Sequence, residues 1–131
     1  MGLDNYIEVR RNEYTNTIPE LKRFNISWDK ANEYDFEICY WRKAWNIRHG
    51  IFSILGGEDR EEYEYPVSAE HIDKIITFLG SLNKHNWTDG GGSIWTWDEY
   101  KGHIKQNARD LKRLRKLMNK YDLEVVFIDS Y

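Results

Sequence analysis

The sequence has little cysteine and proline and no long apolar run. Its 131 residues include two prolines and a single cysteine, Cys39, which excludes an internal disulfide. Cys39 lies in an apolar stretch, so we expect it to be a small core residue rather than a nucleophile. No apolar segment approaches the roughly 18 residues of a membrane span, and the first residues lack a secretory signal. We therefore expect a cytoplasmic protein with no membrane partner.

A strong excess of charge of either sign is also missing, because 19 basic residues stand against 22 acidic ones for a net charge of −3. Aromatic residues are abundant instead: six Trp, nine Tyr and five Phe make up 15% of the chain, at a mean hydropathy of −0.79. A chain of this length buries roughly two thirds of its unfolded surface without a metal or a disulfide. The composition predicts one domain over 1–131, with the rings either in the core or partly outside for a partner.

Strands are predicted near both ends and in the middle of the chain. Alternating apolar and polar residues predict a strand at 3–10. A short strand at 36–40 is expected to lead directly into a helix over 41–55, and the apolar run at 124–129 predicts a strand covered on both faces. A capping-box spacing further predicts a short helix from 17 to about 24.

Two further helices have clear starts. Ser68 is placed as an N-cap, with Val67 and Ile72 spaced as a hydrophobic staple. Thr96 and Glu99 have capping-box spacing before a helix of roughly 24 residues. The whole pattern predicts an α+β domain, in which a short sheet of N-terminal, middle and C-terminal strands packs against three main helices.

The helix predicted at 41–55 carries two apolar rows and a polar stripe that includes Arg42, Asn46 and His49. Such a stripe either faces water or lines the floor of a cleft. In a cleft, Arg42 can hold a carboxylate or phosphate, and His49 can hold a phosphate together with it. Trp95 and Trp97, beside a Gly-rich loop, can stack on a base. These five residues are the predicted ligand-binding set.

Catalytic and metal-binding patterns are missing. The loop at 90–93 is not followed by the Lys-Ser/Thr of a phosphate-binding loop, and the four histidines lack metal-ligand spacing. We predict no catalytic residue, no metal and no cofactor. Asp35 and Glu37 can be considered as an acid and base pair, but carboxylates at a strand edge are expected to be solvated. An enzyme is therefore the least favoured class.

Two charged segments and one ring are candidates for partner contacts. The last helix carries eight basic and three acidic residues over 98–121, and its Lys105, Lys112 and Lys116 can meet the phosphates of nucleic acid. A solvated helix face is the favoured interpretation of these lysines. An acidic loop and a tryptophan form the predicted partner-binding set: Glu58, Asp59, Glu61, Glu62, Glu64 and Trp87.

Four segments carry a resemblance to a known family: the start Met1 to Tyr6, Glu37 to Ala44, Tyr65 to Ser68, and the Gly-aromatic stretch before Asp98. In them the chain resembles an uncharacterised family of small phage and prophage proteins that begin Met-Gly-Leu-Asp and carry a Tyr-Trp-Arg-Lys-Ala motif. The resemblance implies an accessory protein in the host cytoplasm that acts by binding and inhibits a host factor or defence system, as anti-CRISPR proteins do. The alternative is a protein that binds or sequesters a nucleotide or another small signal molecule.

Overall fold

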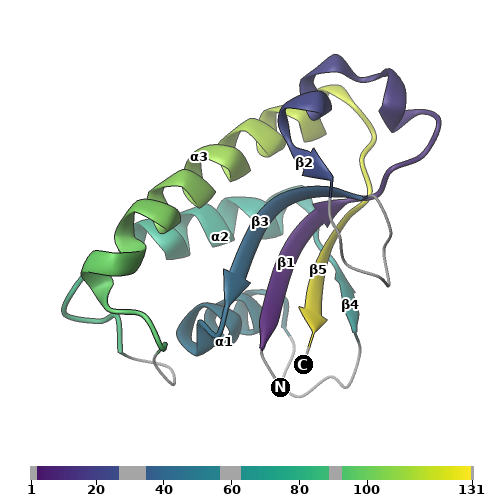
Figure 1. The fold of residues 1–131 in the computed structure, drawn as a ribbon. Coiled ribbons are helices and arrows are strands. Elements are labelled where there is room, and N and C mark those ends of the chain that lie inside the picture. Colours follow the sequence, from purple (N-terminus) through teal and green to yellow (C-terminus); the bar gives the residue numbers. More distant parts are fainter. Residues whose placement is uncertain (1–2, 27–34, 57–62, 89–92, 131) are drawn as a thin grey trace.

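The computed structural model describes residues 3–26, 35–56, 63–88 and 93–130. Within these ranges five strands form one sheet in the order β2-β3-β1-β5-β4, and every neighbouring pair is antiparallel (Figure 1). The strands are β1 (Asp4–Val9), β2 (Asn25–Ile26), β3 (Phe36–Arg42), β4 (Glu64–Pro66) and β5 (Val125–Ser130). The strands from the two ends of the chain lie side by side in the middle of the sheet.

Three α-helices cover one face of this sheet (Figure 1). They are α1 (Trp45–Ile54), α2 (Ala69–Ser81) and α3 (Trp97–Lys120). Two short 3-10 helices, η1 (Thr15–Thr17) and η2 (Pro19–Arg23), follow β1 and lie near the C-terminal end of α3 (Figure 1). The predicted α+β domain is confirmed, with a short helix before residue 24 that is of the 3-10 kind.

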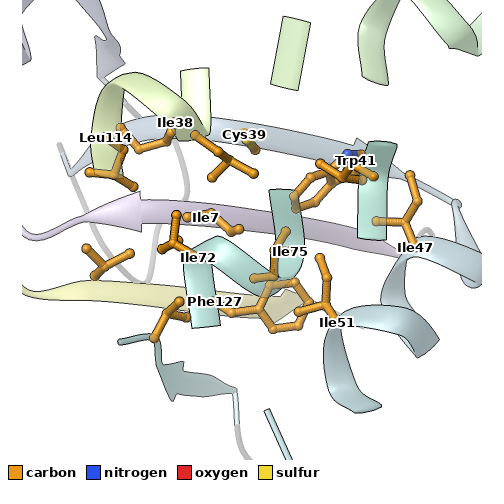
Figure 2. Packing of buried hydrophobic residues seen from close by; sticks show 14 of the residues in the cluster. Ile7, Ile38, Cys39, Trp41, Ile47, Ile51, Ile72, Ile75, Leu114 and Phe127 are labelled. Atoms are coloured by element: carbon orange, nitrogen blue, oxygen red, sulfur yellow. The ribbon is translucent and has the colours of Figure 1, made fainter. Parts of the chain in front are cut away.

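The core lies between the sheet and the helical layer. Ile7 of β1, Phe127 of β5 and Ile75 of α2 are fully buried there as members of one apolar cluster, and Figure 2 shows their side chains between the sheet and the helices. Cys39 of β3 is 2% exposed, which confirms its predicted place in the core. Burial raises the pKa of its thiol well above the ordinary value, so the thiolate that a nucleophile needs is disfavoured.

Both predicted helix starts are confirmed. The hydroxyl of Ser68 accepts the His71 N–H at 3.1 Å, and Nδ1 of His71 accepts the Ser68 N–H at the same distance. Thr96 and Glu99 make the equivalent pair of hydrogen bonds at the start of α3, at 2.9 and 3.2 Å. The backbone N–H of Thr96 lowers the pKa of Glu99, because it stabilises the charged carboxylate.

The predicted helix at 41–55 is wrong in its first turn. β3 continues to Arg42, and α1 begins only at Trp45. Trp41 lies in β3 and is fully buried. Its Nε1–H donates to Oδ1 of Asn107 in α3 at 2.8 Å. Lys43 then turns the chain with a positive φ of 49°. The helical spacing between Trp41 and Trp45 is therefore a coincidence of two apolar positions in different elements.

A second difference concerns β4, which falls in a stretch predicted to be a loop and helix entry. Tyr65 lies opposite Phe127 of β5 in the antiparallel ladder. Three residues are too few for an alternating pattern to show in the sequence. The tertiary contact with β5 decides the conformation of this segment.

Candidate functional site

The predicted polar stripe does not exist as one helix face. Arg42 ends β3 and is exposed, whereas His49 is exposed on α1. Asn46 is 5% exposed, its amide donates to the carbonyl oxygen of Trp87, and its Oδ1 accepts the Ile47 N–H at 2.9 Å. Because Asn46 is committed to these internal hydrogen bonds, it is a structural residue that ties α1 to the segment after α2.

The tryptophans at 87, 95 and 97 form one packed cluster with Tyr100. Trp87 was expected to face a partner, but it is 3% exposed. Its Nε1–H donates to the Trp95 carbonyl oxygen at 2.7 Å, and its ring centroid lies 5.7 Å from that of Trp97. Trp95 stacks on Tyr100 and donates its Nε1–H to the carbonyl oxygen of Arg42 at 2.8 Å. The cluster joins the start of α3 to the end of β3, and only Trp95 and Trp97 keep partly exposed rings.

The acidic loop can be followed at one position. Glu58, Asp59, Glu61 and Glu62 lie outside the described residues. Glu64 is in β4, and its carboxylate pairs with the guanidinium of Arg10. Arg10 directly follows β1, so this ion pair connects β4, at one edge of the sheet, to the end of β1.

The same Arg10 corrects the expectation that Asp35 and Glu37 are solvated. Arg10 pairs with Asp35 at 2.8 Å, and the Asp35 side chain is 8% exposed. Burial acts to lower the pKa of Arg10, but Asp35 and Glu64 outweigh it and raise that pKa. Glu37 is half-buried, and desolvation raises the pKa of its carboxyl. Asp35 is thus held in an ion pair rather than left in water.

Metal and membrane contacts have no support in the part of the chain that the structure describes. Among those residues no three or more His, Cys, Asp and Glu side chains group so as to hold a metal ion. None of the helices described is long and apolar enough to cross a bilayer.

The exposed face of α3 brings together the three lysines that the sequence suggested for nucleic acid. Lys105, Lys112 and Lys116 share this face with Arg109 at steps of four, three and four residues, which places all four on one side of a helix. The opposite side buries Ile104, Leu111 and Leu114. At 1.5 Å per residue the row is about 16 Å long. We call these four side chains the α3 basic row.

The basic row differs from the other cations of α3 in its lack of acidic partners. Four cations of the helix form ion pairs at 2.9 to 3.5 Å: Lys101 with Asp98, Arg113 with Asp110, Arg115 with Asp73, and Lys120 with Glu20. No acidic residue within the described ranges pairs with a member of the row, and the contact made by Arg109 is to the neutral side chain of Gln106. The row is therefore an exposed, uncompensated strip of positive charge.

One feature beside the row had no sequence signal. A shallow groove of about 330 Å³ lies between η2 and the C-terminal half of α3. It is lined by Glu20, Arg23, Phe24, Arg113, Lys116 and Leu117. Arg23 and Phe24 are far from α3 in the sequence, so only the fold reveals that they share a surface with Lys116.

Fold and surface together define an antiparallel α+β domain with a basic helix face. Comparison of the chain with protein-family models, with curated proteins and with solved structures found no match.

Proposed function

We propose that the protein acts by binding nucleic acid, and that the α3 basic row is its contact surface. The observation that supports this proposal is the row itself: four exposed cations on one helix face, without an acidic partner in the described part of the chain. Cations that neutralise phosphates release condensed counterions, and this release drives binding independently of base sequence. A row of about 16 Å matches roughly five phosphates of one strand at 3.4 Å of rise each.

Charge interactions within α3 do not favour the row. Neighbouring like charges at i,i+3 and i,i+4 destabilise a helix by about 0.2–0.5 kcal/mol per pair. The helix dipole favours cations only within the last turn. Lys105 and Arg109 lie in the middle of α3, far from that turn. Their repulsion is offset when a polyanion lies along the row.

The net charge of −3 does not oppose this surface. At physiological salt the Debye length is about 8 Å, so a bound phosphate responds mainly to the charges beside it. The acidic side chains of Glu64, Asp35 and Glu20 are engaged with Arg10 and Lys120. On α3 itself Asp98 and Asp110 are paired with Lys101 and Arg113, so these two carboxylates do not neutralise the basic row.

The role in a phage remains a prediction of the family resemblance. The basic row supports one form of this role. A protein that covers a stretch of nucleic acid prevents a host factor from binding to that stretch. The sequence predicts instead that an acidic loop and Trp87 contact the inhibited partner. Trp87 is buried, so this ring is not offered to a partner.

The test compares two double variants by fluorescence anisotropy with labelled oligonucleotides. Lys105→Ala/Lys112→Ala removes two of the four positive charges of the row. Lys74→Ala/Lys84→Ala removes the same amount of charge from exposed positions in and after α2. We expect the first variant to lose most of the affinity at about 50 mM salt and the control to stay close to the wild type. Equal losses in both variants, or a wild type that binds no oligonucleotide, would contradict the proposal.

A further inference from the structure

The groove between η2 and α3 has an apolar floor and positively charged residues around it. Leu117 is 8% exposed and belongs to the apolar cluster of the core, and the partly buried Phe24 packs against that cluster. Arg23, Arg113 and Lys116 stand around this floor with exposed side chains. The groove thus offers an apolar surface, including one aromatic ring, next to three positive charges.

Glu20, the one acidic residue of the groove, is already engaged. Its carboxylate accepts hydrogen bonds from Nζ of Lys120 at 3.2 Å and from the hydroxyl of Tyr121 at 3.1 Å. Its backbone N–H and these partners lower its pKa, because each stabilises the charged carboxylate. Glu20 is therefore compensated on its own side of the groove. Arg113 is paired with Asp110 at 3.5 Å, so Arg23 and Lys116 supply the net positive field of the groove.

This combination matches the chemistry of one nucleotide. A base has an apolar face that stacks on aromatic side chains, and its phosphate is held by Arg and Lys. The volume of about 330 Å³ lies at the lower end of the range typical of small-ligand sites. A purely apolar ligand would leave the cations unused, and a bare phosphate would leave Phe24 unused.

The groove is continuous with the α3 basic row, because Lys116 belongs to both. A strand whose phosphates follow Lys105, Arg109 and Lys112 therefore arrives at the groove. In a duplex the bases are paired and stacked inside, so no base is free to lie on Phe24. In a single strand the bases can be unstacked and splayed out.

We propose that this groove holds one nucleotide of a single-stranded nucleic acid, with the base against Phe24 and Leu117 and the phosphate between Arg23 and Lys116. The inference rests on the proposed function, since the strand reaches the groove along the basic row. It adds a preference for single strands over duplex, which the row alone does not create.

Two variants test the groove with the rest of the row intact. Phe24→Leu keeps an apolar side chain but removes the ring, and we expect it to lower affinity for a single-stranded 15-mer about fivefold or more. Arg23→Ala removes one exposed cation and is expected to lower that affinity roughly tenfold. Lys22→Ala is the matched control, because Lys22 is the exposed neighbour of Arg23 and does not line the groove.

The affinity for a duplex of the same length separates the groove from the row. We expect Phe24→Leu to change duplex binding less than twofold, whereas Lys105→Ala/Lys112→Ala weakens both forms. If Phe24→Leu is too unstable to assay, Arg23→Ala against Lys22→Ala gives the same comparison at exposed positions. The groove assignment would be overturned if Phe24→Leu lost the same fraction of its affinity for single strand and for duplex, or if Arg23→Ala and Lys22→Ala bound the single strand equally well. Either result would leave the α3 basic row as the proposed contact surface.

A nucleoside monophosphate is the second probe. Because the strand is held by the row as well as by the groove, we expect the monophosphate to displace the 15-mer only at concentrations far above the Kd of the strand. A monophosphate that binds the wild type as tightly as the 15-mer would overturn the strand as occupant. A wild type that binds no oligonucleotide at low salt would overturn the proposed function and the groove assignment together.

Discussion

The contact between α1 and α2 makes a sharp prediction at Gly50. A Cβ placed on Gly50 would lie 2.1 Å from Cζ of the Phe78 ring in α2, with two more ring atoms within 2.6 Å. Forcing a methyl group into a packed contact costs about 1–3 kcal/mol. Replacing Gly by Ala inside a helix otherwise gains about 0.5–1 kcal/mol. When the helix gain is subtracted from the cost of the clash, Gly50→Ala is expected to lower the free energy of unfolding by roughly 0 to 2.5 kcal/mol.

Gly80→Ala and Gly102→Ala provide matched controls, because a Cβ at either position meets no atom within 4 Å. Gly102 lies inside α3 and has the helix gain without the clash, whereas Gly80 lies in the last turn of α2 and has a smaller gain. The difference between Gly50→Ala and either control isolates the clash at about 1–3 kcal/mol, or about 4–12 °C in Tm for a domain of this size. The assay is thermal and urea unfolding followed by circular dichroism.

The reasoning is refuted if all three glycine variants are stabilised alike, because α1 and α2 then do not approach as closely as the structure has them. Adding Phe78→Leu to Gly50→Ala should recover part of the lost stability, since a smaller side chain makes room for the methyl group. Two independent losses that simply add would also contradict a direct contact between these positions.

Two further predictions concern one buried and one half-buried polar group. Asn107→Ala leaves the fully buried Trp41 Nε1–H without its acceptor and should cost about 1–3 kcal/mol in urea unfolding; a loss no larger than that of exposed Gln106→Ala would speak against this hydrogen bond. Desolvation raises the folded-state pKa of Glu37 above its ordinary 4.5, so its contribution to stability is present below that value and is lost as pH rises through the folded pKa. Glu37→Gln should therefore raise Tm at pH 7 and change it little near pH 4; a lower Tm at pH 7 would show that the charged form is stabilised.

Local signals in the sequence predict much of the fold. The helix starts at Ser68 and Thr96 rest on capping side chains within three residues of each other, and these contacts form as expected. The strands at the two ends of the chain follow from alternating or continuous apolar residues. Such short-range patterns do not depend on what the rest of the chain does.

The boundary between β3 and α1 could not be predicted in this way. Trp41 fits a helix by its spacing from Trp45, but its place is decided by Asn107, far away in the sequence. The predicted stripe loses Arg42 for the same reason, since Arg42 belongs to β3 and not to the helix. Asn46 is lost because it is buried and hydrogen-bonded to Trp87, a contact that helical spacing does not show. The strand β4 is likewise decided by its partner β5.

The α3 basic row shows the same limit. The sequence identifies Lys105, Lys112 and Lys116 as basic, but it does not show which cations of α3 are neutralised by Asp73 or Glu20. Only the folded chain separates the paired cations from the uncompensated row. It also brings Phe24 to α3, which no spacing rule connects.

The salt dependence of single-strand binding tests the central claim most directly. If each cation of the α3 basic row meets one phosphate, log K should fall against log salt with a slope of about −2.8, at about −0.7 per contact. The slope for Lys105→Ala/Lys112→Ala should shrink to about −1.4, while Lys74→Ala/Lys84→Ala keeps the wild-type slope. A wild-type slope near zero, or a slope that the loss of Lys105 and Lys112 leaves unchanged, would contradict the account.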